Sequence, residues 1–361
     1  MLTIAAVLLV CLLIPAGVLL VCSSGKAEPF MYEKGRPLEG SISEKVFVSI
    51  NGVRQGMFIK SKDATNPVLL YLHGGMPDYF LTKRYPTGLE ECFSVVWWEQ
   101  RGSGISFNAS IPPEMMTLEQ MISDTLELTN YLRRRFSQEK IYLMGHSGGT
   151  FIGIQAAARV PELYHAYLGV AQMSYQLKSE KLAYDYMLKQ FKEKGNRKMV
   201  RKLEAAPVTM TGGTPQLYIK VRDKAMHSLG VGTIREMHSV ITGIFLPSLL
   251  CREYTLREKL NMWLGKSRSG VSILYDTMMS TDLSKVVPRI DLPVYFFEGI
   301  YDYTCSFTEA KAYFEKLKAP LKGFYIFEHS AHSPLFEEAE KMLRILCEDV
   351  LAGMNKLADA K

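Results

Sequence analysis

The segment Ile141–Thr150, IYLMGHSGGT, places a serine between glycines directly after a short apolar run. The apolar residues 141–144 indicate a buried strand, and the alanine-rich stretch 150–159 indicates a helix that stops before Pro161. A Gly-x-Ser-x-Gly sequence between strand and helix is typical of a nucleophile elbow, whose strained backbone exposes the serine hydroxyl at the end of a sheet. The alternative is an ordinary glycine turn. The context favours Ser147 as a catalytic nucleophile.

A serine hydroxyl needs a base to become a good nucleophile, and an imidazole is the usual one. Two of the seven histidines, His329 and His332, follow the last predicted strand in the segment FEHSAHSPLF. In open α/β sheets the active site lies outside the carboxyl ends of the strands, so this loop is in the right layer. We predict His332 as the base because it lies further into the loop. His329 is the alternative, although it is close enough to the strand end to remain within its pairing.

The imidazole in turn needs an acid that orients it. The segment LPVYFFEGIYDYT supplies Asp302 in the turn after a predicted strand, with Glu298 at the strand end as runner-up. Asp291 precedes the same strand and is therefore expected at the wrong edge of the sheet. The order Ser147, Asp302, His332 is the chain order used by folds that carry a nucleophile elbow.

An oxyanion hole requires backbone N–H donors aimed at the developing negative charge. Gly148 follows the nucleophile and is one predicted donor. The glycine turn His73-Gly74-Gly75, after an earlier predicted strand, supplies the second. We predict Gly75, with Met76 as the alternative; a glycine turn without function is the competing interpretation.

Strand and helix patterns alternate along the rest of the chain, which predicts an α/β fold with a largely parallel sheet covered on both faces. Asn51-Gly52 predicts a hairpin turn between the first two strands. The core is predicted in two parts, residues 44–173 and 289–361. Strands are expected at 44–50, 56–60, 67–72, 93–98, 141–144, 166–171, 293–297 and 323–327, and core helices at 118–135 and 335–351.

Residues 174–288 interrupt this alternation and are predicted to form a helical cap inserted between two strands, where it could roof the site. Helical patterns cover 178–194, 234–244 and 255–263. The basic face of 178–202 is interpreted as a solvated helix surface, with contact to anionic lipid as the alternative.

Composition excludes several function classes. The 361 residues are 47% hydrophobic with a net charge of +6, and no basic-aromatic patch suggests nucleic acid. The six cysteines are scattered without a C-x-x-C pair, and no Cys/His spacing indicates a metal site. They are Cys11, Cys22, Cys92, Cys251, Cys305 and Cys347.

The N-terminal residues 1–22 are predicted to be a single membrane anchor followed by a linker, residues 23–43. Leu2 to Cys22 carries no charged residue and is long enough to span a bilayer. A cleaved signal peptide and a lipoprotein acylated at Cys22 are the alternatives. Lys26, Lys34 and Arg36 follow the run, so the positive-inside rule favours a cytoplasmic catalytic domain.

Three segments carry a resemblance to a known family. They are LHGGMP (72–77), WWEQRGSGIS (97–106) and GHSGG (145–149). The chain resembles the α/β-hydrolase superfamily and, within it, the proline iminopeptidase-like branch, over residues 45–171 and 290–350. The resemblance implies a cap over a Ser-His-Asp site and no cofactor.

Two departures from the pattern of this branch concern the substrate. Met76-Pro77 stands where the branch has Pro-Gly, and Glu99 replaces an aspartate. The branch holds the free amine of its substrate with cap carboxylates, and Glu236, Glu253 and Asp276 are candidates. We therefore predict a serine hydrolase that cleaves an ester or an amide of a small molecule or short peptide. The alternative is a non-catalytic binding module on the same fold.

Overall fold

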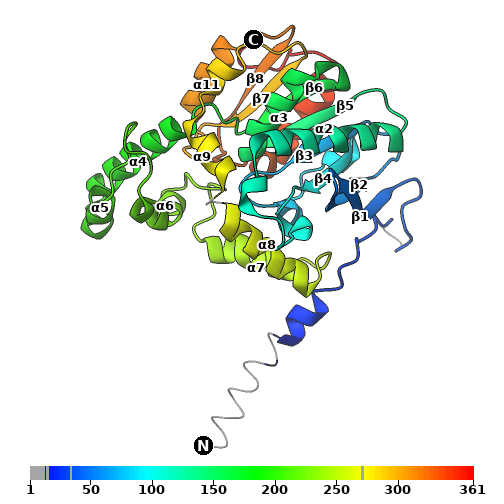
Figure 1. The fold of residues 1–361 in the computed structure, drawn as a ribbon, viewed down its shortest axis with the longest axis horizontal. Helices are drawn as coiled ribbons and strands as arrows, with labels where there is room; N and C mark the ends of the chain where they lie inside the picture. Colours follow the sequence, from blue (N-terminus) through cyan, green and yellow to red (C-terminus); the bar gives the residue numbers. More distant parts are fainter. Residues whose placement is uncertain (1–12, 14–15, 33–34, 270–271) are drawn as a thin grey trace, which may run out of the picture.

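The structure is a computed structural model and describes residues 13, 16–32, 35–269 and 272–361. An eight-stranded sheet has the order β1-β2-β4-β3-β5-β6-β7-β8 (Figure 1). Neighbours from β4 through β8 are parallel, whereas β2 is antiparallel to both β1 and β4. The strands are β1 (Ile42–Ile50), β2 (Val53–Ser61), β3 (Val68–Leu72), β4 (Ser94–Glu99), β5 (Ile141–His146), β6 (Tyr164–Val170), β7 (Val294–Gly299) and β8 (Lys322–Phe327).

The eight predicted strands are confirmed, with small shifts at their ends. The hairpin between β1 and β2 is also confirmed, because Asn51 and Gly52 have φ angles of 46° and 73°. Two consecutive positive φ angles match the twist of a two-residue hairpin, and Asn-Gly accepts them at low cost.

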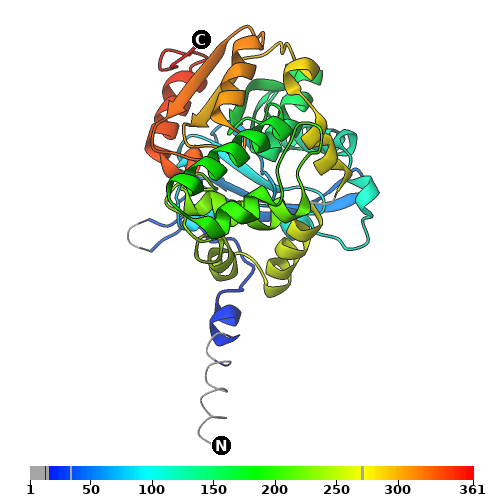
Figure 2. The same cartoon turned by 90° about the vertical axis from the view of Figure 1, so that its left-hand side faces the viewer.

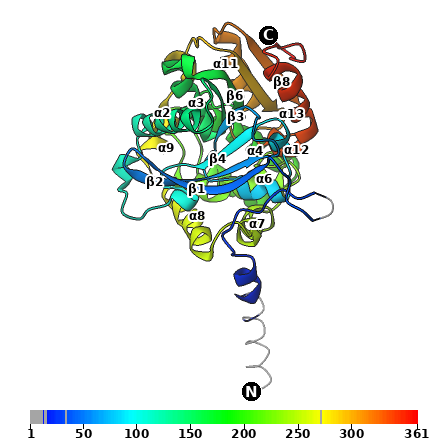
Figure 3. The same ribbon diagram turned by 90° about the vertical axis from the view of Figure 1, so that its right-hand side faces the viewer.

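Side chains that alternate along each strand divide the core into two layers. Leu143 and Phe296 belong to one layer, and their neighbours Met144 and Phe297 belong to the other. The two layers are covered by different helices, which Figure 3 shows on opposite sides of the sheet. The first layer packs under α2 (Leu118–Arg135), α3 (Gly148–Arg159) and α11 (Phe307–Lys316), and the second under α12 (Pro334–Glu337), α13 (Ala339–Ile345) and the π-helical turn η7 (Leu346–Val350).

The interval between β6 and β7 is helical, as the sequence predicts, and its described residues pair only through isolated bridges. Figures 1 and 2 show these helices at the edge of the sheet from which the strand-end loops emerge. They are α4 (Gln176–Glu193), α5 (Arg197–Glu204), α6 (Gln216–Ser228), the π-helical turn η6 (Ile241–Phe245), α7 (Leu246–Leu250), α8 (Leu256–Ser269), α9 (Ile273–Ser280) and α10 (Leu283–Val286).

Two predicted helices are partly wrong. Residues 234–239 are not helical, because tertiary bonds hold this part of the chain: Arg235 N–H donates to Glu337 Oε2 of α12 at 2.7 Å, and Gly232 O, just before the segment, accepts from His332 N at 3.4 Å. The last helix is interrupted at Glu338, whose φ and ψ of −128° and 54° are not helical. Tertiary hydrogen bonds outweigh local helical propensity at both places.

The predicted linker 23–43 is docked onto the molecule rather than free. Gly25 N–H donates to Arg252 O at 3.0 Å, and Glu28 N–H donates to Glu253 Oε1 at 2.7 Å. The predicted anchor lies mostly outside the described residues. Across the part that is described, no helix has the length and hydropathy to span a membrane.

A buried ion pair links the segment after β4 to α2. The Arg101 guanidinium donates to both carboxylate oxygens of Asp124, at 2.7 and 2.8 Å, and neither side chain is more than 1% exposed. Asp124 also accepts from the side-chain amides of Asn51, Gln55 and Gln120. The charge of this carboxylate is therefore fully compensated inside the protein.

Removing one partner of this pair should destabilise the protein strongly, because the remaining buried charge loses its compensation. We expect Asp124→Ala to lower the free energy of unfolding by about 3–5 kcal/mol in urea titrations. The matched control is Glu119→Ala, which breaks the exposed pair with Arg159 and should cost at most about 1 kcal/mol. Equal losses in the two variants would show that burial does not set the strength of the Arg101–Asp124 pair.

Candidate active site

Ser147 lies at a sharp turn between β5 and α3. Its φ and ψ are 56° and −123°, a conformation that a residue with a side chain rarely adopts. The turn is tight because β5, α3 and β3 approach closely: a Cβ on Gly149 would lie 2.1 Å from Leu72 O. A Cβ on Gly145 would lie 2.7 Å from the backbone of Gly149. Ser147 thus has the backbone geometry of the predicted elbow.

Asp302 and His332 come together from the loops after β7 and β8. His332 Nδ1 lies 2.8 Å from Asp302 Oδ2, and the carboxylate is fully buried. The other oxygen, Oδ1, accepts from the N–H groups of Thr304 and Cys305 at 2.6 and 3.0 Å. Burial by itself raises the pKa of Asp302, but the imidazole and these N–H donors outweigh it and hold the pKa below its usual value. Asp302 is therefore ionised at neutral pH and fixes the ring of His332.

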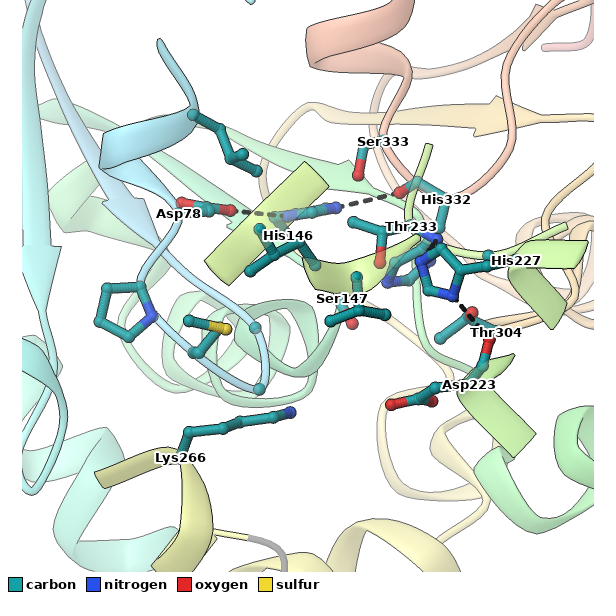
Figure 4. Close-up of a pocket in the computed structure, with 18 of the residues that line it drawn as sticks. Asp78, His146, Ser147, Asp223, His227, Thr233, Lys266, Thr304, His332 and Ser333 are labelled. Atoms are coloured by element: carbon teal, nitrogen blue, oxygen red, sulfur yellow. Dashed lines mark hydrogen bonds and ion pairs between the residues drawn. The ribbon is translucent and has the colours of Figure 1, made fainter. Parts of the chain in front are cut away.

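Ser147 and His332 line the same cavity of about 230 Å³ (Figure 4). In the described structure the serine hydroxyl bonds to Cys305 Sγ at 3.9 Å and not to the imidazole. Catalytic hydrogen bonds in empty sites are often long and tighten when substrate binds. A hydrogen bond between this hydroxyl and His332 therefore stays a prediction for the substrate-bound state.

The alternatives considered for the base and the acid lie in other environments. His329 is exposed, and its backbone N–H donates to Glu338. Glu298 is buried next to β6, where it accepts from Gln172 N–H at 2.8 Å, and burial raises its pKa well above the usual value. Asp291 is exposed and pairs with Arg289. Among these candidates, only Asp302 bonds to His332.

The glycine turn after β3 contacts the nucleophile. A Cβ on Gly74 would lie 2.8 Å from Ser147 Cβ, and a Cβ on Gly148 would lie 3.7 Å from Gly74 Cα. Gly75 and Gly148 line a second cavity of about 380 Å³ that also reaches Ser147. Both predicted oxyanion donors are therefore next to the nucleophile, and their role as donors stays a prediction.

The segment after β4 holds this glycine turn in place. Gln100 N–H donates to His73 Nε2 at 3.2 Å, and the Gln100 amide donates to His73 O at 2.8 Å. Because Nε2 accepts, Nδ1 must carry the proton that it donates to Gly74 O at 2.9 Å. Burial lowers the pKa of His73 to about 4, which agrees with a neutral ring.

His146, inside the elbow, connects two loops. Its Nδ1 lies 3.0 Å from Asp78 Oδ2, and its Nε2 lies 3.0 Å from His332 O. Burial alone would lower the pKa of His146, but the bond and the charge of Asp78 outweigh it and raise the pKa. Sequence patterns carry no signal for this connection, because Asp78 lies in the loop after β3 and His146 at the end of β5.

The cap supplies charged side chains to the cavity that the sequence did not single out. Arg222 Nε donates to Glu180 at 2.7 Å, and Arg222 also pairs with Asp223 at 2.9 Å. The Asp223 carboxylate is 62% exposed within the cavity, and Lys266 extends from α8 toward it (Figure 4). A Cβ on Gly75 would lie 3.3 Å from Lys266 Nζ, so this ammonium lies at the glycine turn.

The three cap carboxylates suggested by the sequence lie elsewhere. Glu253 is buried and pairs with Lys60 and Lys83, while Glu236 and Asp276 are exposed and outside both cavities. The cap carboxylates that line the second cavity are instead Glu180 and Asp223. Helical periodicity could not identify these two, because their position depends on how α4 and α6 pack over the sheet.

The described residues contain no cluster of His, Cys, Asp and Glu side chains that could hold a metal ion. The groups present suit acyl transfer: a hydroxyl at a strained turn, a buried imidazole–carboxylate pair and backbone N–H groups beside the hydroxyl.

Comparison with known proteins agrees with this geometry. Residues 67–339 match the family described as serine aminopeptidase, S33. The chain is 30% identical over 306 residues to a probable aminopeptidase, YbaC, of Bacillus subtilis (strain 168), covering 84% of this chain and 94% of the relative.

Solved structures share the fold. A proline iminopeptidase from Mycobacterium smegmatis superposes with a TM-score of 0.60 at 13% identity, covering 86% of this chain and all of that one. A bacterial membrane phospholipase A superposes with a TM-score of 0.59 at 17% identity, covering 97% and 99%. On the extent of the family match and of the likeness to YbaC, the chain belongs to the S33 serine aminopeptidase family of α/β-hydrolases.

Proposed function

We propose that this hydrolase cleaves an amide or ester bond through an acyl-enzyme on Ser147. The observation that carries the proposal is the 2.8 Å contact of His332 with the ionised Asp302, in the same cavity as a serine at a strained turn. His332 takes the hydroxyl proton as Ser147 attacks the carbonyl carbon, and returns a proton to the leaving group. Water then attacks the acyl-enzyme by the same route, which releases the acid and restores the serine.

The N–H groups of Gly75 and Gly148 are proposed to hold the oxyanion. The N–H group of Gly75 does not have to move during the reaction, because the bonds between His73 and Gln100 hold the glycine turn in place. The ammonium of Lys266 beside Gly75 adds a positive charge where negative charge develops.

The cap is proposed to select substrates with a free amine. Enclosure by the cavity raises the pKa of Asp223, but the charges of Arg222 and Lys266 outweigh it and lower the pKa, so the group is a carboxylate at neutral pH. Its side chain faces the cavity opposite Ser147 (Figure 4). The likeness to a probable aminopeptidase supports a short peptide or an aminoacyl derivative as substrate.

Membrane attachment through residues 1–22 is a second proposal. It rests on the uncharged sequence from Leu2 to Cys22, which has the length of a bilayer-spanning helix. A cytoplasmic side for the catalytic domain rests on the basic residues that follow this run.

The nucleophile assignment can be tested with a fluorophosphonate probe. We expect the probe to label the wild-type chain and Ser147→Ala to abolish labelling, because the probe reacts with activated serine hydroxyls. His332→Ala should lower turnover by several powers of ten, about as much as Ser147→Ala, since triad members act as a unit. His329→Ala is the matched control and should keep wild-type turnover. Full labelling of the Ser147→Ala variant would contradict the assignment.

The selectivity assignment concerns Asp223. We expect Asp223→Asn to lower kcat/KM for an aminoacyl-naphthylamide by about ten- to a hundredfold, the usual worth of a hydrogen bond to a charged group. The same variant should leave kcat/KM for the N-acetylated substrate unchanged, because that substrate has no ammonium. Glu236→Gln, an exposed cap carboxylate outside the cavity, is the control. Equal loss for both substrates would show that Asp223 does not bind the amine.

His146 should make the stability of the histidine loop depend on pH. Both of its ring nitrogens face acceptors, Asp78 Oδ2 and His332 O, so both must donate and the ring must be an imidazolium. Its folded pKa is raised above the unfolded value of about 6.5. The stabilisation is therefore complete below about pH 6.5 and is lost as pH rises through the folded pKa.

Unfolding in urea at several pH values measures this effect. We expect the difference in free energy of unfolding between wild type and His146→Gln to be largest in mild acid and to shrink as pH rises. His329→Gln, which changes an exposed histidine of the same loop, should show no such trend. A difference that is constant with pH would mean that His146 is neutral in the folded protein.

A further inference from the structure

Helix α8 presents an apolar stripe to solvent. Leu256, Leu260 and Leu264 are 41%, 59% and 52% exposed. Residues four apart lie on one side of a helix, so the three side chains form a continuous row. The opposite side of the same helix is buried, with Lys259 and Met262 at 0% exposure. The row is therefore an outer surface of the cap and not part of its core.

The preceding helical segment extends this row. Ile241 and Phe245 of η6 and Leu246 and Leu250 of α7 are 64%, 38%, 42% and 49% exposed. The ring of Phe245 packs against Trp263 of α8 at 5.1 Å between centroids, which joins the two segments. We call the seven exposed residues the apolar cap face: Ile241, Phe245, Leu246, Leu250, Leu256, Leu260 and Leu264.

The exposed charges around the apolar cap face are basic. Within residues 241–268 the exposed charged side chains that do not line the cavity are Arg252, Arg257 and Arg268. The two acidic residues of this segment are occupied: Glu253 pairs with Lys60, and Glu258 pairs with Lys45. An apolar surface bordered by basic side chains is the pattern of helices that bind at the boundary of an anionic bilayer.

The N-terminal apolar sequence ends beside this face. Lys259 of α8 donates to Cys22 O, to Ser23 Oγ at 3.0 Å and to Leu249 O at 2.6 Å, so it ties the end of the N-terminal segment to α7 and α8. Figures 1 and 3 show the described N-terminal helix projecting from the same end of the molecule as α7 and α8. Val18, Leu20 and Val21 on this helix are exposed as well.

We infer that the apolar cap face is a docking surface for an anionic lipid bilayer. The inference rests in part on the proposed membrane attachment, because an N-terminal anchor would hold this face at the membrane surface. Charge favours a bilayer over a second copy of the chain: a symmetric dimer through this face would bring the basic borders of two copies together. Anionic headgroups would instead neutralise them.

Docking would also orient the cavity. Val240, Ile244 and Trp263 lie on the same segments as the apolar cap face and line the cavity that contains Ser147. Trp263 is half-buried and lies between the two, because it lines the cavity and packs against Phe245 of the apolar cap face.

Trp263 provides a probe for the test. The chain has three tryptophans, and Trp97 and Trp98 are buried in β4 at 3% and 1% exposure. The full chain would be reconstituted in vesicles of equal parts phosphatidylcholine and phosphatidylglycerol whose acyl chains carry bromine, a short-range quencher that reaches a tryptophan packed against the face. We expect strong quenching that disappears in Trp263→Phe. Quenching that is absent, or unchanged in Trp263→Phe, would overturn the inference.

Substitutions on the face make the test specific. Leu260→Glu and Leu264→Glu should each reduce the quenching of Trp263 severalfold, whereas Leu217→Glu, at a leucine of α6 that is 58% exposed, should not. Unchanged fluorophosphonate labelling of Ser147 shows that each variant is folded. Equal effects of all three substitutions would contradict a specific face. Lipid-independent crosslinking between copies that Leu260→Glu abolishes would show that a second copy covers the face.

The outcomes separate this inference from the proposals on which it rests. Failure of the full chain to float with vesicles refutes both the membrane attachment and the docking. Flotation without quenching of Trp263 refutes the docking alone. Loss of fluorophosphonate labelling in the wild-type chain refutes the proposed hydrolase mechanism and leaves the quenching result unaffected.

Discussion

The close approach of β3, β5 and α3 at residues 145–149 is the constraint on which the site depends. No side chain fits at Gly149 against Leu72 O, and none fits at Gly145 against the next turn. This tight packing holds the backbone of Ser147 at a φ of 56°. Without it, the residue before a helix would relax to an ordinary backbone conformation. The same contact places the glycine turn after β3 next to the nucleophile. Strain at one residue thus determines where both the hydroxyl and its neighbouring N–H groups lie.

Two histidines, one neutral and one cationic, then fix the loops around the elbow. His73 accepts a hydrogen bond from Gln100 and is neutral, whereas His146 donates from both nitrogens and is cationic. Burial lowers the pKa of both rings. At His146 the bond to Asp78 and its charge outweigh burial and raise the pKa, whereas at His73 burial prevails. The cation bonds to the backbone oxygen of His332, so the proposed base is positioned through its backbone as well as through the contact of its ring with Asp302. The glycine turn, the elbow and the histidine loop are therefore parts of one polar network.

The sequence could predict what depends on local pattern and chain order. The strands, the hairpin at Asn51-Gly52 and the placement of Asp302 against His332 follow from periodicity and from the rule that sites lie at strand ends. It could not predict contacts between loops that are distant in sequence, such as Asp78 with His146, or cap residues such as Asp223. The helix expected at 234–244 was wrong over residues 234–239 for the same reason, because Arg235 N–H donates to Glu337, which is distant in sequence. The role of residues 1–22 stays a prediction, since most of them lie outside the described residues.

Three sides of helix α8 make different contacts, and together these contacts link the site to the surface of the molecule. Lys266 reaches the cavity beside Gly75, Lys259 binds the end of the N-terminal segment, and Leu260 lies in the middle of the exposed row. These three residues belong to one continuous helix, Leu256–Ser269, so their order along it is fixed. The helix that carries the charge near the proposed oxyanion is thus also the helix that holds the part of the chain proposed to meet the membrane.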